Sequence, residues 1–233
     1  VATATHGTGV NTGSISSQIA AMRIISSDGA VHIASPTENK DLYDAARVGL
    51  GAVGVISTIT LKVVPLFKMR KRKISYTLPA LMRDLPELMR TYDRMQWSYT
   101  PYTNEAIVTI REETTSPIDP PDSGCWTSPS PDDSTDISYK TMVDSASGYE
   151  ARSLYTEMEM FIPVEYTADA IEDFLLYQES VRHYHNPRVE LFTGVRYVMG
   201  DDITLSPLFN RNSSVISFIV LGNTNHTGDP REF

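Results

Sequence analysis

The stretch VATATHGTG, residues 1–9, opens the chain with small residues, a histidine and two glycines. Glycines on either side of a threonine allow backbone N–H groups to converge on an anion such as a diphosphate, and the Thr8 hydroxyl adds a hydrogen-bonding group. The stretch lacks the GxGxxG spacing of a Rossmann fingerprint and the Gly-Lys-Ser/Thr of a P-loop. On its own it indicates either an anion-binding loop or a plain tight turn.

A second glycine-rich stretch, GLGAVGVI at 49–56, leads into a β-branched run. Its glycines allow a close backbone approach, and main-chain N–H groups near Val55 are suited to meet the edge of a flat polar ring. Alone, this stretch is also consistent with a packing or turn element.

The bulk composition limits the class of protein. With 41% hydrophobic residues among 233, the chain can form a real core, which argues against disorder. A net charge of −9 disfavours nucleic acid as the main partner, because phosphate binding needs a basic face. The basic run KMRKRK at 68–73 indicates either a patch for a polyanion or membrane surface or, as we prefer, the solvated face of a strand.

The single cysteine, Cys125, excludes an internal disulfide framework and a cysteine-based zinc site. No apolar run in the sequence is long enough to span a bilayer. The adjacent pair Asp201-Asp202 is predicted to cap a turn rather than bind a metal, because neighbouring carboxylates point in different directions. His183 and His185 lie two residues apart near a predicted helix end, a poor chelating spacing, so no metal site is expected.

Turn and capping signals divide the first third of the chain into short elements. Asp28-Gly29 predicts a hairpin over 21–34 with a tight primed turn. Ser35 is predicted to cap a short helix, with Glu38 completing a capping box and Gly49 ending it. Alternation over 55–64 predicts a strand with Ile59, Leu61 and Val63 on one face.

The remainder predicts an α+β region. Pro86 should break or restart the helical pattern over 81–95, and the Pro/Ser-rich stretch 114–135 predicts a long mobile loop. A helix should begin at a Thr167 cap and end at Asn186-Pro187, with Ile171, Phe174, Leu175 and Val181 facing the core. Further strands are predicted at 74–77, 97–111 (a pair), 157–166, 189–198 and 213–222.

Taken together, these stretches resemble a known family. VATATHGTG followed by ARVGLGAVGVISTITLKVVP (46–65) is similar to the FAD-binding domain of the vanillyl-alcohol-oxidase-type flavoproteins. The second half resembles the substrate domain of their sugar-lactone oxidase subgroup, which includes L-gulonolactone and D-arabinonolactone oxidases and is related to alditol oxidase and galactonolactone dehydrogenase. That likeness is carried by MQWSYTPYTNEA (95–106), EMEMFIPVE (157–165), VRYVMGDDITLSPLFNR (195–211) and HTGDPREF (226–233).

The resemblance implies an α+β fold in two parts. Residues 1–66 would be the C-terminal part of a PCMH-type FAD-binding domain, and 67–233 a mixed-sheet substrate (cap) domain with flanking helices and the mobile loop 114–135. Relatives carry flavin-binding segments on both sides of the matched region, so we expect the chain to be an internal portion of a longer enzyme that is inactive in isolation.

The resemblance also implies which residues meet the FAD cofactor. The first loop would contact the diphosphate and its neighbouring groups, with His6 as a structural or cofactor-contact residue, and the second stretch would offer backbone contacts to the flavin or adenine. The residues so assigned are Thr5, His6, Gly7, Thr8, Gly9, Thr12, Gly13, Ser14, Ile15, Gly54, Val55 and Ile56.

Arg196 is the candidate catalytic residue. An arginine inside an apolar strand is costly to bury without an anionic or strongly polar partner. In the family, the arginine of the matching strand points at the substrate near the flavin, where a fixed positive charge would orient a lactone carbonyl. The alternative is a structural salt bridge, for instance to Asp201 or Asp202. Many relatives carry a glutamate two positions before this arginine, but here that position is Gly194.

The resemblance implies flavin-dependent oxidation of a sugar-derived 1,4-lactone in an ascorbate-type pathway, with electrons passing to O2 or to a cytochrome such as cytochrome c. Oxidation of open-chain alditols and a non-catalytic, flavoprotein-like subunit of a larger assembly are the alternatives. The family also implies association with a membrane or larger complex and a mitochondrial or endoplasmic-reticulum location, which the sequence itself does not specify.

Overall fold

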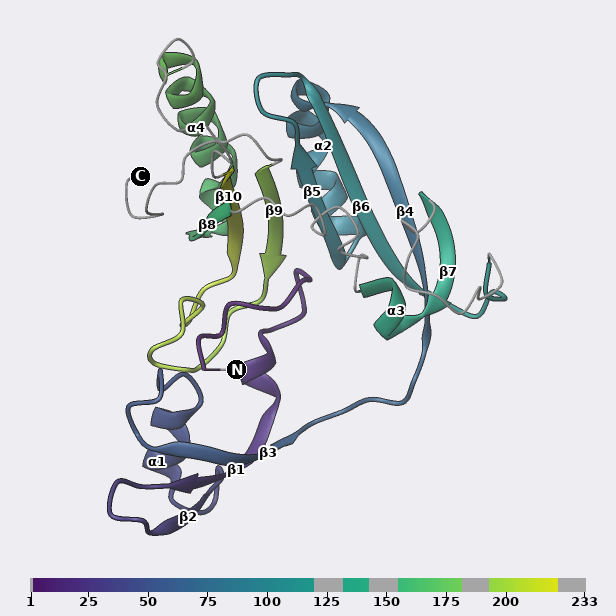
Figure 1. Cartoon of the computed structure of the whole chain (residues 1–233). Helices are drawn as coiled ribbons and strands as arrows, with labels where there is room; N and C mark the ends of the chain where they lie inside the picture. The colour runs from purple at the N-terminus through teal and green to yellow at the C-terminus, as the bar shows by residue number, and fades with distance from the viewer. Residues whose placement is uncertain (1, 120–131, 143–154, 182–192, 222–233) are drawn as a thin grey trace. The chain divides into compact units, whose positions relative to one another are not determined.

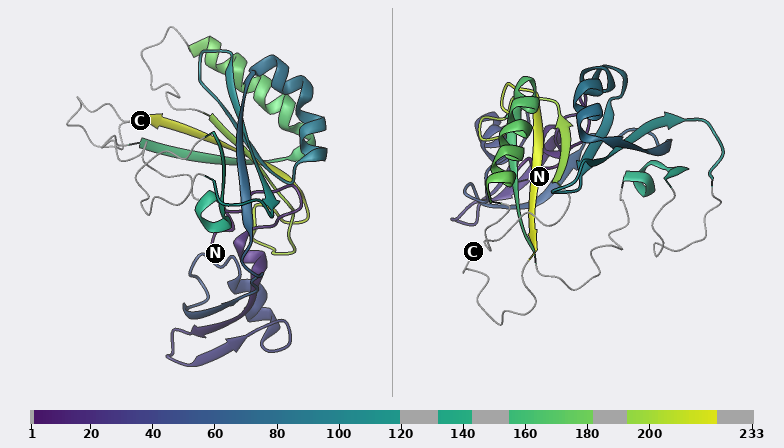
Figure 2. Two further views of the ribbon diagram at one scale, coloured as in Figure 1. Left: turned by 90° about the vertical axis from the view of Figure 1, so that its right-hand side faces the viewer. Right: turned by 90° about the horizontal axis from the view of Figure 1, so that it is seen from above.

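The structure, a computed structural model, describes residues 2–119, 132–142, 155–181 and 193–221. The chain divides into two compact units (Figures 1 and 2). Unit 1 contains Val1–Pro65 and Tyr197–Ser213, and unit 2 contains Leu66–Arg196 and Ser214–Phe233. The expected division at 66/67 assigned 197–213 to the second part, whereas the structure groups this segment with the first because it pairs with the N-terminal loop.

Unit 1 is built on a small antiparallel sheet of order β2-β1-β3. Its core contains Ile19, Met22, Ile24, Ala34, Tyr43 and Ala46. The elements are the 3-10 helix η1 (Ile15–Gln18), β1 (Ile19–Ile25), β2 (Val31–Ala34), α1 (Lys40–Ala46) and β3 (Val55–Leu61).

The β1–β2 hairpin is confirmed, but its predicted primed turn is wrong. The Gly29 N–H donates to Ser26 O and the Ser26 N–H donates to Ala30 O, each over 3.0 Å. Gly29 alone in the loop has a positive φ, of 83°, whereas a type I′ turn needs two such residues. The Asp28 carboxylate accepts hydrogen bonds from the Ala30 N–H and the Ser26 hydroxyl, which favours this three-residue loop.

The helix α1 forms, but Ser35 does not cap it. The Ser35 hydroxyl accepts hydrogen bonds from the Thr37 and Glu38 N–H groups and closes a separate turn. The helix begins at Lys40, after Asn39, whose φ of 48° places it in the left-handed region. The predicted capping box is therefore wrong, and the helix begins about one helical turn later than predicted, at Lys40.

The strand β3 carries a bulge that changes its buried face. The pairs Arg23–Thr58 and Ile24–Ile56 leave Ser57 as the extra residue. Ile56 and Ile59 therefore both pack against the core, although they are three residues apart. The predicted face of Ile59, Leu61 and Val63 is wrong, since Leu61 is exposed and Val63 lies beyond the end of the strand.

Unit 2 is built on a seven-stranded sheet of order β7-β4-β6-β5-β9-β10-β8. The pairs from β7 through β9 are antiparallel. The strands are β4 (Lys68–Thr77), β5 (Arg94–Tyr99), β6 (Glu105–Thr114), β7 (Asp133–Ile137), β8 (Tyr155–Pro163), β9 (Thr193–Val198) and β10 (Ser213–Leu221). The helices are α2 (Leu78–Thr91), α3 (Ser138–Met142), the 3-10 helix η3 (Val164–Tyr166) and α4 (Thr167–Val181).

The helix α2 runs through Pro86 without interruption, so the predicted break is wrong. Its N-terminus lies three residues earlier than expected, where Thr77 accepts a hydrogen bond from the Ala80 N–H. Met95, expected in the helix, is a buried residue of β5. The strand β7 and helix α3 were not predicted. The predicted loop 114–135 is wrong at its end, where residues 133–135 belong to β7, and residues 120–131 lie outside the described residues.

The helix α4 begins at Thr167, close to the predicted start, and Ile171 is buried. Thr167 is not the predicted N-cap, because its backbone is already helical and its hydroxyl donates to Val164 O over 2.7 Å. The aromatic ring of Phe174 packs against Tyr99 and Phe218, as expected for a core-facing residue. The predicted end of this helix and residues 189–192 of the next strand lie outside the described part of the chain.

The two faces of the large sheet differ in character. Along β5, Met95, Trp97 and Tyr99 are buried. Tyr99 donates a hydrogen bond to Gln178 of α4, so this apolar face is the one that α4 covers. The alternate residues Arg94, Gln96 and Ser98 lie on the opposite, polar face. The helices α2 and α4 lie along the apolar face (Figure 2).

The basic run does form a strand, β4, but it is not simply a solvated face. Lys71 is fully buried and lies opposite Arg111 on β6. The Arg111 side chain donates a hydrogen bond to Thr141 O of α3 over 2.9 Å, so α3 covers the polar face at this end of the sheet. Among the described residues, no helix has the length and apolar character needed to cross a membrane.

Candidate functional site

The N-terminal loop folds back on itself through its backbone. The Ile15 N–H donates to His6 O over 3.0 Å. A Cβ placed on Gly7 would lie 2.7 Å from Gly13 O, so only glycine allows the two arms of the loop to approach this closely. The predicted cofactor residues from Thr5 to Ile15 therefore form one compact loop.

The same loop pairs with the residues that directly follow Arg196. The Gly9 N–H donates to Tyr197 O over 2.7 Å, and the Met199 N–H donates to Thr12 O over 3.0 Å. Gly9 and Val198 form a parallel bridge. The strand that carries the predicted catalytic arginine thus continues into residues that pair with the predicted cofactor loop, although the two lie almost 190 residues apart in sequence.

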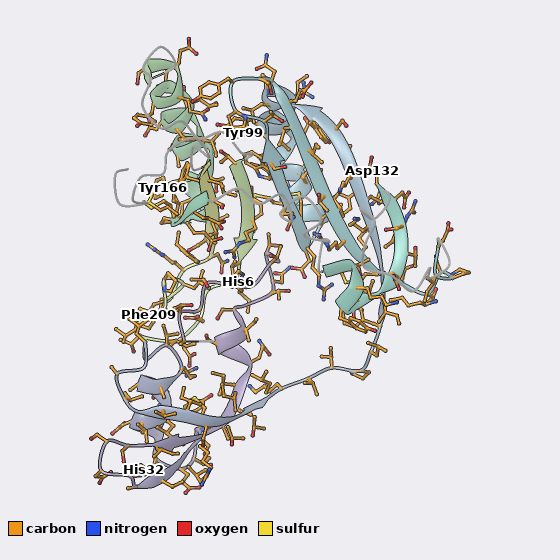
Figure 3. The ribbon with its side chains drawn as sticks, in the orientation of Figure 1. His6, His32, Tyr99, Asp132, Tyr166 and Phe209 are labelled. Carbon is orange, nitrogen blue, oxygen red and sulfur yellow. The ribbon has the colours of Figure 1, made fainter. Side chains whose placement is uncertain are left out.

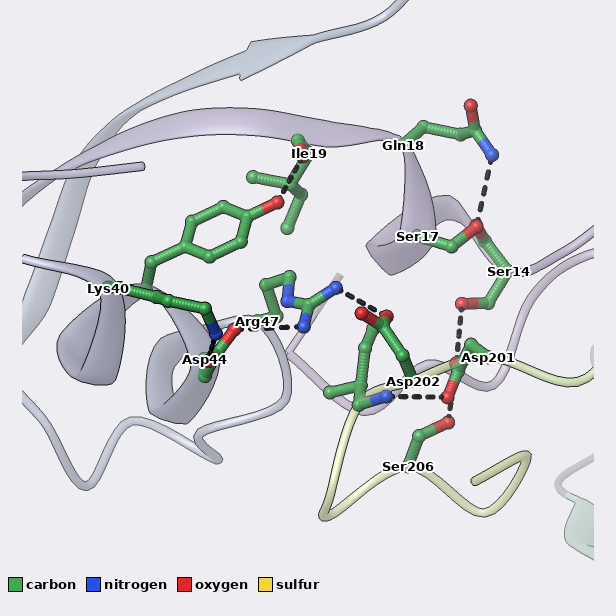
Figure 4. Close-up of polar contacts among 12 residues, drawn as sticks. Ser14, Ser17, Gln18, Ile19, Lys40, Asp44, Arg47, Asp201, Asp202 and Ser206 are labelled. Carbon is green, nitrogen blue, oxygen red and sulfur yellow. Dashed lines mark hydrogen bonds and ion pairs between the residues drawn. The ribbon is translucent and has the colours of Figure 1, made fainter. Parts of the chain in front are cut away.

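Asp201 fixes the far side of this loop (Figure 4). Its carboxylate accepts hydrogen bonds from the Ser206 hydroxyl at 2.7 Å and the Ile203 N–H at 3.1 Å. It also accepts a longer one, at 3.4 Å, from the hydroxyl of the buried Ser14. These contacts confirm that Asp201 holds a turn, and they assign Ser14 a structural partner inside the protein.

Asp202 pairs with Arg47, an interaction that the sequence did not suggest (Figure 4). The guanidinium lies 2.7 Å from Asp202 and 3.0 Å from Asp44, and it stacks on the Tyr43 ring at 4.8 Å from the centroid. The hydrogen bond from Arg47 lowers the pKa of Asp202 below its ordinary value. Arg47 therefore ties α1 to the segment that supports the loop.

Several groups of the loop remain directed outward. His6 is exposed (Figure 3), and Ile15 has 46% of its side chain exposed. Thr5 bonds to Thr3 at 3.2 Å. Within the described part of the chain, Thr8 makes no hydrogen bond through its amide or hydroxyl although it is half-buried. Its two polar groups are suited to an external acceptor or donor.

The second predicted stretch lies at the opposite end of β1 from this loop. The loop leads through η1 into Ile19, whereas Val55 pairs with Ile25. Six strand residues separate these ends, a span of about 20 Å. The predicted contacts therefore fall into two groups that a compact ligand cannot touch at once.

The backbone around Val55 is suited to close contact. Gly54 has a φ of 126°, and a Cβ there would lie 2.4 Å from Ile25 O. Val55 is 67% exposed, whereas Ile56 packs against the core. Because β3 is an edge strand of the described sheet, alternate backbone groups on its outer side remain open.

Arg196 lies on the polar face of the large sheet, opposite Gln96 of β5. Its guanidinium lies 2.6 Å from the Glu159 carboxylate of β8, and the two side chains are 15% and 21% exposed. The prediction that the arginine needs an anionic partner is confirmed. The suggested partners are wrong: Asp201 bonds to Ser206 and Ser14, and Asp202 to Arg47.

The position beside the arginine is open. Gly194 lies two residues before Arg196 and therefore on the same face. A Cβ on Gly194 would have only the Ser217 Cβ within 4 Å, at 3.9 Å. The Ser217 hydroxyl donates to Glu157, which lies two residues before Glu159 on β8. The face around Arg196 thus carries hydroxyls and an amide, groups that bind polyhydroxylated molecules, and its two carboxylates pair with Ser217 and Arg196.

No cluster of three histidine, cysteine or acidic side chains suited to a metal ion occurs among the residues that the structure describes. His183 and His185 lie outside them. Sequence reasoning missed Glu159 and Arg47 as partners of the site. The alternation of EMEM at 157–160 could have placed Glu157 and Glu159 on one face, but no sequence signal connects them to Arg196.

The chain is similar in sequence to several known proteins. The chain is 26% identical over 260 residues to L-gulonolactone oxidase of Mus musculus, covering 94% of this chain and 56% of that protein. It is 40% identical over 106 residues to L-gulono-1,4-lactone dehydrogenase of Mycobacterium tuberculosis, covering 46% and 24%. It is 28% identical over 121 residues to D-arabinono-1,4-lactone oxidase of Yarrowia lipolytica, covering 52% and 23%. No family model matches the chain.

Among solved structures, cholesterol oxidase from Brevibacterium sterolicum superposes with a TM-score of 0.69 at 13% identity, covering 97% of this chain and 57% of that one. The predicted fold class is thereby confirmed. The chain spans little more than half the length of the first of these relatives. The chain is therefore similar in sequence to sugar 1,4-lactone oxidases and dehydrogenases, and it has the fold of the solved cholesterol oxidase.

Proposed function

We propose that the protein oxidises a sugar-derived 1,4-lactone with FAD as its cofactor. The observation that carries the proposal is the pairing of the N-terminal loop with residues 197–199, because it joins the glycine loop to the strand of Arg196. The homologues are named as lactone oxidases and dehydrogenases, which supports the same reaction class.

The described residues fit FAD. Thr8 offers an amide and a hydroxyl that make no hydrogen bond to any described residue, on a loop that two close glycines keep narrow. Gly54 and Val55 offer open backbone about 20 Å away along β1. FAD is an elongated dinucleotide, so its diphosphate region and one of its ring systems can engage these two groups separately. In this proposal the backbone at Gly54 to Ile56 binds the edge of a ring system. The diphosphate side is bound by the residues of the first loop: Thr5, His6, Gly7, Thr8, Gly9, Thr12 and Gly13.

Ser14 and Ile15 have a different part in the proposal. The Ser14 hydroxyl faces Asp201, so it supports the loop, and its contribution to the cofactor is limited to its backbone. Ile15 is exposed enough to offer an apolar contact. When bound, FAD supplies a flavin ring that accepts a hydride.

Arg196 binds and orients the substrate in this proposal. A guanidinium has five N–H donors in a fixed plane, so it can hold Glu159 and still donate to a lactone carbonyl oxygen. The hydroxyl and amide groups of Ser98, Ser217 and Gln96 are suited to the hydroxyls of a sugar ring. The positive charge of Arg196 also favours negative charge that develops beside it during the reaction.

The electron acceptor and the location belong to the proposal as well. Homologues include both oxidases and a dehydrogenase, so O2 and a cytochrome such as cytochrome c are the two acceptors to compare. We propose association with a mitochondrial or endoplasmic-reticulum membrane from the resemblance alone. Oxygen consumption and cytochrome c reduction, measured side by side with the same lactone, distinguish the acceptors.

The test is anaerobic bleaching of the flavin absorbance of the full-length protein. L-gulono-, L-galactono- and D-arabinono-1,4-lactones are added in turn, with xylitol and sorbitol as open-chain controls. We expect a lactone to bleach the flavin at least ten times faster than either polyol. Bleaching by the polyols alone would indicate that the protein is an alditol oxidase. A protein that purifies without flavin and does not bind added FAD would contradict the proposal.

A further inference from the structure

The ion pair between Arg196 and Glu159 joins two strands that are not neighbours in the sheet. The strand β10 lies between β9, which carries Arg196, and β8, which carries Glu159. The arginine must therefore extend sideways over β10 to bring its guanidinium within 2.6 Å of the carboxylate. Arginine has several rotatable bonds, and the ion pair with Glu159 restricts the positions that its charged end can take over the face.

The immediate surroundings leave the arginine accessible to a ligand. Gly194 contributes no side chain on the same face, and its nearest neighbour there is Ser217. Gln96 lies opposite Arg196 on the other flanking strand, and it is neutral. The Arg196 side chain thus has an open position beside it at Gly194, and its guanidinium is held by the Glu159 carboxylate. This ion pair defines the direction of the guanidinium N–H groups.

We propose that Glu159 is a positioning residue: it fixes the Arg196 guanidinium in the orientation that binds the carbonyl oxygen of the lactone. The proposal rests on the function proposed above, in which Arg196 contacts the substrate. Glu159 itself does not touch the substrate. Its effect is transmitted through Arg196 alone.

The chain offers a matched control on the same strand. Glu157 lies two residues before Glu159 and on the same face, and it pairs with Ser217 rather than with Arg196. Glu157 is exposed, whereas Glu159 is partly buried. Glu157→Gln therefore removes the same charge from the same edge strand without releasing the arginine.

The first experiment compares Glu159→Gln with Glu157→Gln in the full-length flavoprotein. We expect Glu159→Gln to lower kcat/KM for the best lactone about 10- to 100-fold, since a misplacement of a substrate-orienting group by about 1 Å has an effect of this size. Glu157→Gln should stay within about threefold of wild type, as expected for an exposed charge. The thermal midpoint and flavin content of both variants serve as the check on folding.

The second experiment separates positioning from a purely structural role. In an Arg196→Met background, Glu159→Gln should cause no further fall in kcat/KM, because its effect passes through the arginine. A structural role predicts that the two losses multiply. If Glu159→Gln lowers kcat/KM by the same factor in the Arg196→Met background as in wild type, the proposal is overturned.

A third measurement does not depend on turnover. The flavin is first reduced with dithionite so that the lactone cannot be oxidised, and the lactone Kd is measured by calorimetry. We expect Glu159→Gln to raise this Kd about tenfold and Glu157→Gln to leave it unchanged. An unchanged Kd and kcat/KM in a folded Glu159→Gln protein would contradict the proposal.

If Glu159→Gln does not fold, Glu159→Asp provides the test, because it keeps the charge and withdraws it by one methylene. A folded Asp variant with reduced kcat/KM supports positioning, and one with wild-type kcat/KM overturns it. Failure of the function proposed above would look different: wild-type flavin would not be bleached by any lactone. In that case the lactone Kd would be unmeasurable in every variant.

Discussion

Arg47 and Arg196 are both arginines that pair with carboxylates, but their surroundings differ. Arg47 has 7% of its side chain exposed, stacks on Tyr43 and bonds to Asp44 and Asp202. Arg196 has twice that exposure, one carboxylate partner in Glu159 and an open glycine position beside it on the strand. The first arginine holds segments together, whereas the second is held in place on a face that a ligand can reach.

The largest expected effect is on catalysis at Arg196. Arg196→Met keeps most of the side-chain volume and removes the charge. We expect kcat/KM for the lactone to fall about 100- to 1,000-fold, because a fixed charge at the reacting group is lost. The free energy of unfolding should also fall, by about 2 kcal/mol, because Glu159 is only 21% exposed and loses its ion-pair partner. Steady-state kinetics and chemical denaturation provide the two numbers.

At Arg47 we expect a loss of stability without a comparable loss of catalysis. Arg47→Met removes the ion pair with Asp202, whereas Asp44 keeps its ion pair with Lys40. The free energy of unfolding should fall by about 2 kcal/mol, because charge-assisted hydrogen bonds and the stacking on Tyr43 are lost. The kcat/KM of the molecules that remain folded should change far less than in Arg196→Met. If Arg47→Met lost activity at full stability, or Arg196→Met unfolded at full activity, the contrast between the two arginines would be wrong.

A smaller effect is expected from acid. The Arg47 hydrogen bond lowers the pKa of Asp202, so the carboxylate binds its proton less readily in the folded state. The stability that this pair contributes is therefore present above the ordinary aspartate pKa of about 4 and is lost as the pH falls through the lower, folded value. Asp202→Asn should be less stable than wild type at pH 7, and the difference should shrink below about pH 4. A difference that stays constant over this range would contradict the pairing.

The smallest effect concerns Tyr99, on the covered face of the large sheet. Burial raises the pKa of its hydroxyl well above the ordinary tyrosine value, although its hydrogen bond to Gln178 acts in the lowering direction. Ultraviolet titration of tyrosinate should therefore give the same curve for wild type and Tyr99→Phe until the protein unfolds in base. A Tyr99→Phe curve that lacks one early-titrating group would show that this face is open to water.

Local signals in the sequence predicted much of the fold. The hairpin of β1 and β2 follows from turn residues that lie within a few positions of one another, and α4 begins close to where the sequence indicated. The details that failed depend on tertiary packing. Pro86 is tolerated inside α2 because the amphipathic helix packs on the sheet, with Leu78, Leu81 and Leu85 buried in the turns that precede the proline.

The candidate site was predictable only in part. The burial cost of an arginine in an apolar strand indicated Arg196 and its need for an anion. It gave no way to choose Glu159, which is 37 residues away, over nearer acids. Arg47 and Asp202 are 155 residues apart, and no local pattern connects them. Ion pairs between distant segments depend on the folded topology, which sequence periodicity does not contain.

The most direct test of the account is a crystal structure of the full-length flavoprotein, reduced and soaked with the best lactone. The account predicts the lactone on the polar face of the large sheet, with its carbonyl oxygen within about 3 Å of the Arg196 guanidinium. Glu159 should remain paired with the arginine, and the lactone ring should lie over Gly194. A lactone bound elsewhere, with Arg196 contacting only protein, would contradict the central claim.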